Sequence, residues 1–169
     1  LSYGPGGLVF EGTLTGAGLN LEGSDLGTLV ARMVYRDDAL AIEDAVLRLP
    51  DGGEVRLSGS VAFRDPGSVA IEARAESYPL GPILSVAGIR LPIEGRLKGV
   101  VLLSGRPGAP SGRATFEAGP VSVAGVAFDD LEGDLLFTPD FLETGRLVLS
   151  QGTGRLTIRG GIPYRDPGD

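Results

Sequence analysis

The sequence predicts an all-β protein, a curled antiparallel sheet of short strands, and three observations support this prediction. Hydrophobic and polar residues alternate along most of the chain, as they do in strands that bury one face. Glycine and proline are frequent, with 28 and 12 of the 169 residues, which favours many turns. The hydrophobic residues, 42% of the chain, are mainly Leu, Val, Ile and Ala, so the chain carries enough apolar side chains to fold.

The alternation places the strands one after another along the chain. It predicts strands at residues 8–14, 29–36, 40–49, 55–63, 69–76, 93–103, 114–116, 121–123, 131–137, 147–149 and 156–164. The phase of the alternation changes near Asp44 and Ala45, which indicates a β-bulge. The residues Pro50-Asp51-Gly52-Gly53 predict a turn, and "GRPGAPSG" at 105–112 predicts a loop.

One stretch breaks the alternation. Leu80, Ile83, Leu84 and Ala87 recur at intervals of three and four residues, which is the spacing of one face of a helix. Prolines stand near the start of this stretch and a glycine near its end. We therefore predict a single short helix near residues 79–88.

The chain also contains an internal repeat. "GEVRLSGSVAFRDPG" (53–67) and "GRLTIRGGIPYRDPG" (154–168) have large apolar residues at the same alternate positions and end in the same Arg-Asp-Pro-Gly turn. The similarity predicts two related β-meanders, 1–76 and 92–169, joined by the helix and its connection at 77–91. Together they are expected to form one continuous curled sheet, a segment of a longer repetitive protein.

Composition argues against several classes of function. The net charge is −7 and the basic residues are scattered singly, so we expect no nucleic-acid binding. The chain has no Cys and no His, which removes thiolate catalysis and sulfur-bound zinc. The carboxylates Asp130, Glu132 and Asp134 share one strand face and Lys98 lies in a regular strand, and we interpret all four as solvated surface. We expect no enzyme, no cofactor, no metal site and no membrane-spanning helix in this chain.

The apolar face of such a sheet needs cover that one short helix cannot provide. The sheet could close into a sandwich or barrel filled by its own side chains, or it could curl without closing and leave an apolar trough. Small aliphatic side chains fill little volume and favour the trough modestly. The periodicity alone leaves both arrangements open.

Residues 78–160 resemble the repeats of the TamB and AsmA-like envelope proteins. They contain a short "L-x-x-L" helix, the pattern "GxLxGxxxLxG" at 95–105, a proline-containing loop and "DDLxGxL" at 129–135. The resemblance implies a β-taco, an incompletely closed β-structure with an apolar interior that spans the space between two membranes. It also implies a periplasmic location, an inner-membrane anchor outside this chain, and a role in phospholipid transport to the outer membrane or in outer-membrane protein assembly.

The expected function is therefore an apolar groove for passive phospholipid transport between the inner and outer membranes. Its expected partners are phospholipid acyl chains and an outer-membrane assembly barrel protein. Two alternatives remain: a scaffold that assembles outer-membrane or autotransporter proteins by β-augmentation, and a self-packed structural repeat without ligand. The residues expected to line the groove are Leu29, Met33, Val55, Leu57, Val61, Phe63, Ile93, Leu97, Val101, Leu103, Leu156, Ile158, Ile162 and Tyr164.

Overall fold

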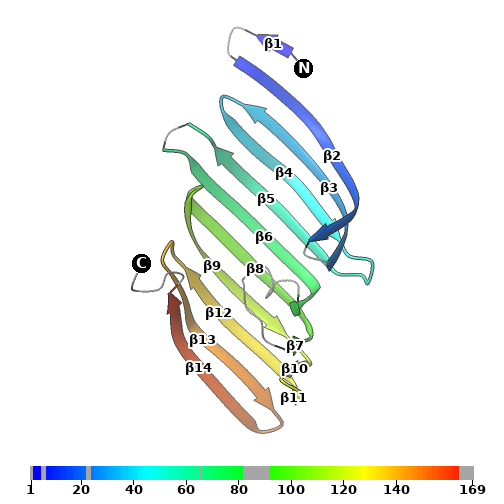
Figure 1. Cartoon of the computed structure of the whole chain (residues 1–169), viewed down its shortest axis with the longest axis vertical. Coiled ribbons are helices and arrows are strands. Elements are labelled where there is room, and N and C mark those ends of the chain that lie inside the picture. Colours follow the sequence, from blue (N-terminus) through cyan, green and yellow to red (C-terminus); the bar gives the residue numbers. More distant parts are fainter. Residues whose placement is uncertain (1, 5–6, 22–23, 65, 82–91, 164–169) are drawn as a thin grey trace.

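A computed structural model describes residues 2–4, 7–21, 24–64, 66–81 and 92–163, and within them the chain forms two antiparallel sheets (Figure 1). The large sheet has eleven strands, in the spatial order β1 (Ser2–Gly4), β2 (Gly7–Leu21), β3 (Ser24–Arg36), β4 (Ala39–Arg48), β5 (Glu54–Ala62), β6 (Ser68–Pro79), β8 (Arg96–Arg106), β9 (Ala109–Ala118), β12 (Asp130–Phe137), β13 (Phe141–Gln151) and β14 (Gly154–Pro163). The small sheet has the order β11 (Val126–Phe128), β10 (Val121–Val123), β7 (Ile93–Glu94).

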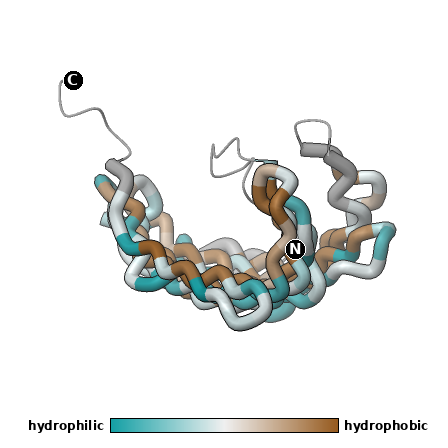
Figure 2. Tube along the Cα trace, turned by 90° about the horizontal axis from the view of Figure 1, so that it is seen from below, coloured by the Kyte–Doolittle hydropathy of each residue, from teal (hydrophilic) through white to brown (hydrophobic). Residues whose placement is uncertain are grey.

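The large sheet is a meander in which each strand pairs with its neighbours along the chain, apart from two excursions. The chain leaves the large sheet after β6 to form β7, and again after β9 to form the hairpin of β10 and β11. These excursions meet as the small sheet. Seen along its long axis, the large sheet is an open gutter whose two sides do not meet, and the small sheet stands on its inner side (Figure 2). The prediction of an all-β, curled and unclosed sheet is confirmed.

Four strands carry an irregularity that bends the sheet. The pairing register shifts between Gly16 and Leu19 in β2, between Ala75 and Tyr78 in β6, and across the pair Glu43–Asp44 in β4. A fourth shift lies in β13, between Thr144 and Leu147. A bulge kinks its strand and increases the local twist, so these positions help to curve the gutter. The bulge predicted near Asp44 is confirmed.

The two halves of the sequence repeat have the same pairing register. Ile42 and Ala45 of β4, on either side of its bulge, face Gly59 and Leu57 of β5. The corresponding residues on either side of the β13 bulge, Thr144 and Leu147, face Gly160 and Ile158 of β14. The repeated sequence thus encodes a bulged strand and its straight partner. The division of the chain into two meanders stays a prediction.

Three expectations about local structure need comment. The predicted helix near 79–88 lies mostly outside the described residues, of which Leu80 and Gly81 alone have helical geometry there. The loop predicted at 105–112 is wrong, because β8 runs to Arg106 and β9 begins at Ala109, which leaves a tight two-residue turn. The strand predicted at 93–103 is two strands, β7 and β8, since Gly95 adopts φ 143° and turns the chain from one sheet into the other.

The fold leaves much of its surface in contact with water. The chain exposes 10907 Å², whereas a compact protein of 17.4 kDa would expose about 7,900 Å². No described side chain is fully buried. The curvature therefore does not close around a filled interior. No helix within the described residues has the length and apolarity needed to cross a membrane.

Candidate functional site: the concave apolar face

The pairing register places most of the large apolar side chains of the large sheet on one side, the side against which the small sheet packs. The small sheet stands on the inner side of the gutter, so this is the inner side (Figure 2). We call this side the concave face. Its described non-glycine side chains, apart from a threonine in β13, are Phe10, Leu14, Leu19, Leu29, Ala31, Met33, Tyr35, Leu40, Ile42, Ala45, Leu47, Val55, Leu57, Val61, Val69, Ile71, Ala73, Ala75, Tyr78, Leu97, Val101, Leu103, Pro110, Ala114, Phe116, Ala118, Leu131, Leu135, Phe137, Leu142, Leu147, Leu149, Leu156 and Ile158. The threonine, Thr144, directs its hydroxyl to the carbonyl oxygen of Asp134, 3.5 Å away. The period-two pattern of the sequence therefore makes one continuous apolar surface.

The small sheet covers one end of the concave face. Val121 of β10, 3% exposed, packs in a core cluster with Leu80, Leu97, Leu131 and Leu149. Partly buried residues of all three strands of the small sheet, together with neighbours on the large sheet, pack around this cluster. These contacts form the best-buried apolar core within the described residues.

The rest of the concave face has no such cover. Met33, Leu57, Val61 and Val101 are half-buried by their neighbours in the sheet. At the two edges of the sheet the exposure increases further. Phe10 and Leu14 of β2 are 42% and 48% exposed, and Leu156 and Ile158 of β14 are 52% and 40% exposed.

Small side chains line the middle of the gutter. One row of directly paired residues crosses the sheet from β2 to β14, and its members in order are Leu14, Ala31, Ala45, Leu57, Ala73, Val101, Ala114, Leu135, Thr144 and Gly160. We call it the middle row. Half of its residues are Ala or Gly, so they project little into the gutter. Ala31, Ala45 and Ala114 are buried beneath their larger neighbours, so the middle row is a low apolar floor.

Aromatic rings cover glycines at other points of the concave face. The ring of Phe116 lies over Gly133, its cross-strand partner, so that a methyl group added there would overlap the ring. Phe137 covers Gly112 in the same way, at 2.8 Å from such a methyl group. These pairs fill the holes that glycine leaves and help to fix the register.

The predicted groove residues fall into several groups. Most of them lie on the concave face, namely Leu29, Met33, Val55, Leu57, Val61, Leu97, Val101, Leu103, Leu156 and Ile158, while for Ile162 the structure gives the backbone pairing with Leu142. Phe63 follows β5 and packs its ring against Tyr35, with centroids 6.5 Å apart. Ile93 belongs to the small sheet, packed against the core cluster, and therefore covers the face. Tyr164 lies outside the described residues. Whether any of them contacts a lipid stays a prediction.

Sequence reasoning missed the alanines of the middle row and the cover over Leu97. Alternation assigned Leu97 and Val101 to the same face, which is confirmed, but one is 7% exposed and the other is half-buried in the open part. The alternation of "VSVAGVAF" at 121–128 was visible, yet it could not indicate which surface these strands would pack on.

The opposite, convex face carries the charges. Lys98 pairs with Glu117, and Arg74 pairs with Glu72 at 2.6 Å, all on exposed side chains. The carboxylates Asp130, Glu132 and Asp134 share this face and are exposed. The described residues contain no cluster of potential metal ligands. Exposed pairs of this kind contribute little to stability.

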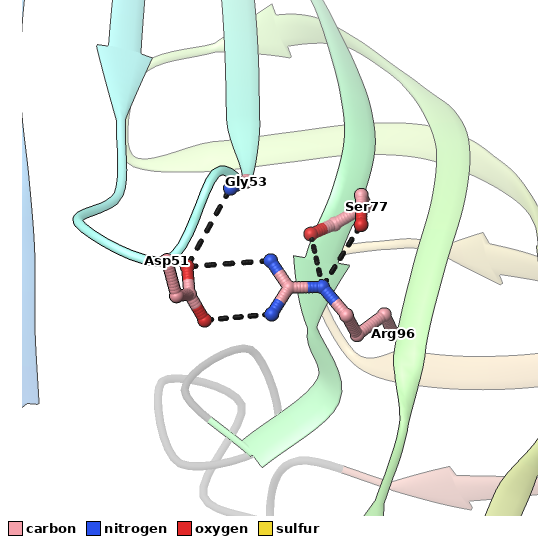
Figure 3. Close-up of polar contacts among 4 residues, drawn as sticks. All are labelled: Asp51, Gly53, Ser77 and Arg96. Atoms are coloured by element: carbon pink, nitrogen blue, oxygen red, sulfur yellow. Dashed lines mark hydrogen bonds and ion pairs between the residues drawn. The ribbon is translucent and has the colours of Figure 1, made fainter.

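A charged clamp fixes one rim of the gutter (Figure 3). Arg96 donates from Nη1 and Nη2 to the two carboxylate oxygens of Asp51, at 2.6 and 3.2 Å, and from Nε to the carbonyl and hydroxyl oxygens of Ser77, both at 2.8 Å. Asp51 also accepts from the backbone N–H of Gly53 at 3.5 Å. The clamp ties the β4–β5 turn to the bulge of β6.

The clamp makes stability depend on pH in acid. The hydrogen bond from Arg96 is the main reason that the pKa of Asp51 lies below its usual range. A carboxyl with a lowered folded pKa contributes stability above its unfolded pKa of about 3.9, and the contribution is lost as the pH falls through the folded pKa. We expect Asp51→Asn to lower the free energy of unfolding at neutral pH and to flatten its decline below about pH 4. Urea unfolding of both proteins at several pH values measures this, and parallel pH profiles would contradict it.

A second polar cluster lies at the opposite rim. Asp38 accepts hydrogen bonds from Arg64 Nε at 2.9 Å and from the hydroxyl of Tyr35 at 3.1 Å. The hydrogen bond from Arg64, followed by that from Tyr35, lowers the pKa of Asp38. The apolar surface thus ends in charged groups at this rim, where the β3–β4 and β5–β6 connections meet.

Comparison with known proteins found no match: no family model, curated protein or solved structure is similar to this chain.

Proposed function

We propose that the concave face shelters lipid acyl chains, as one segment of a cell-envelope protein through which phospholipids pass between the inner and outer membranes. The middle row carries this proposal. A sheet that only needed a core would be expected to fill its concave side with large side chains, whereas the side chains of Ala31, Ala45, Ala73 and Ala114 project little above an apolar floor. A hydrocarbon chain fits such a surface because it fills space with apolar groups and needs no hydrogen-bond partner.

The proposed mechanism is passive. Each methylene group that moves from water onto an apolar surface contributes roughly 0.8 kcal/mol, so a few shielded methylenes offset the cost of carrying a chain through an aqueous space. The open side of the gutter leaves a polar headgroup in water, next to rims that already carry charge. The described side chains of the face are almost all apolar, and the proposed role is not enzymatic.

A pair of substitutions in β6 tests the proposal. Ala73 lies in the middle row between Leu57 and Val101, whereas Ala70 lies on the convex face between Ser60 and Ser104. We expect Ala73→Phe to occupy the room of two or three methylenes and to reduce binding of a fluorescent-acyl phospholipid by roughly tenfold or more. Ala70→Phe adds the same ring to the outer face and is expected to leave binding unchanged.

The measurement is fluorescence titration of the purified proteins, with mass spectrometry of an organic extract to detect copurified phospholipid. Circular dichroism of both variants serves as the control for folding. The proposal fails if the unsubstituted protein binds no phospholipid, or if the two substitutions reduce binding equally.

One observation favours a second candidate, a scaffold that binds client strands by β-augmentation. Strand β14 forms one edge of the large sheet, and its residues 154–161 are exposed. Its outer backbone groups are available to an added strand. A scaffold would bind unfolded β-strand peptides and would be indifferent to Ala73→Phe.

A further inference from the structure

We infer that the large sheet continues from one molecule to the next, with β2 of a second copy of this chain pairing along β14. The result would be a head-to-tail assembly in which the concave faces join into a longer gutter. The inference extends the proposed function to the assembled form, but the pairing itself rests on the two sheet edges and is tested without lipid.

Strand direction permits this pairing. Nine antiparallel pairings separate β2 from β14 across the sheet, and an odd number means that the two edge strands run in opposite directions. A second copy placed beside β14 in the same orientation therefore presents β2 antiparallel to it. The concave faces of the two copies then lie on the same side. Among the described strands, β1 also lies beside the outer edge of β2, but it pairs only with Gly7–Val9.

Side-chain size is complementary where Gly160 meets the other edge. When the rows of the sheet are continued, Gly160 of β14 lies beside Leu14 of the second copy, and Ile158 lies beside Gly16, over which Leu19 of the same strand packs. A methyl group added at Gly160 would meet nothing within 4 Å, so there is room for the leucine. The same alternation of large and small residues occurs inside the sheet, where Gly59 lies between Ile42 and Ile71.

The exposed apolar residues give a reason for the pairing. Of the large hydrophobic side chains that project from the large sheet's strands on the concave face, those more than 40% exposed lie on its edge strands: Phe10 and Leu14 on β2, and Leu156 on β14, with Ile158 at 40%. Within the described residues, no charged side chain points inward from either edge, although inward charges are a common protection against edge pairing. A neighbouring copy would cover Leu14, Leu156 and Ile158 as the interior strands cover their own apolar residues.

Cross-linking tests the pairing and its register. The continued rows place Thr15 of β2 opposite Arg159 of β14 on the convex face, and the chain has no cysteine of its own. Under oxidising conditions we expect the double variant Thr15→Cys, Arg159→Cys to form a ladder of dimers, trimers and larger species. A mixture of the two single variants is expected to stop at dimers. Self-cross-linking of either single variant would show like edges pairing and would overturn the inference.

A charge series provides a test that does not depend on thiol chemistry. Thr15→Glu is expected to strengthen self-association by up to about fivefold, because it places a carboxylate opposite Arg159, and Thr15→Lys is expected to weaken it by a similar factor. Sedimentation velocity over a range of protein concentrations measures both. A protein that stays monomeric throughout, or a series in the opposite order, would refute the pairing. Lipid binding by monomers would leave the proposed function intact in that case.

Discussion

Replacing Leu97 by Arg is expected to unfold the covered end of the gutter, whereas replacing Val101 by Arg is expected to leave the fold intact. Both residues lie on β8 and face the same side. Leu97 is 7% exposed and packs with Val121 and Leu131 beneath the small sheet. No described carboxylate lies within this cluster, so the guanidinium would be buried without a partner. An unpaired buried charge of this kind costs about 3–5 kcal/mol, a large fraction of the stability of a domain.

Val101 differs because its surroundings are open. It lies in the middle row between Ala73 and Ala114, and the long aliphatic stem of an arginine can cross this apolar surface while its charged end reaches water. We expect Val101→Arg to cost no more than about 1 kcal/mol in folding and to abolish phospholipid binding.

Urea unfolding followed by far-ultraviolet circular dichroism compares the two variants. A large fall in the free energy of unfolding for Leu97→Arg alone would support the distinction between a covered and an open part of the concave face. Equal destabilisation by both substitutions would mean that the face is closed throughout, and would contradict the open gutter.

Much of this architecture could be predicted from the sequence because it depends on local periodicity. Alternation at Val55, Leu57 and Val61 assigns one face of a strand wherever the strand lies in the sheet. The phase change at Asp44 identified a bulge for the same reason, and the repeat at 154–168 indicated a second strand of the same kind. Each of these features can be read within one short segment.

The features that could not be predicted depend on contacts between distant segments. The three strands of the small sheet contain only eight residues, and nothing in their alternation says that they pack over Leu97 and Leu149. The middle row combines residues from ten strands, so the run of Ala31, Ala45, Ala73 and Ala114 becomes visible only when the pairing register is known. Tertiary context therefore decides which apolar stripe is a core and which is an open surface.

Replacing Gly59 by Ala is expected to destabilise the protein strongly, whereas the equivalent glycine of the repeat is expected to tolerate the same change. Gly59 has φ 143°, a conformation that residues with a side chain rarely adopt. An added methyl group would overlap the carbonyl oxygen of Ala70 and lie 2.7 Å from Cα of Ile71, both on the neighbouring strand β6. Backbone strain and this overlap together are expected to cost about 2–4 kcal/mol.

Gly160 is the matched control. It holds the same place in β14, opposite the bulge of β13, but its φ is not in the left-handed region and an added methyl group meets nothing within 4 Å. We expect Gly160→Ala to change the free energy of unfolding by no more than about 0.5 kcal/mol. Urea unfolding of the two variants distinguishes an effect of the repeated sequence, which is the same at both glycines, from an effect of the position of the strand in the sheet, which differs between them. Gly59 has a strand on each side and has no space for a side chain, whereas Gly160 lies on an open edge. Equal effects of the two changes would mean that the repeat requires its glycine wherever the strand is placed.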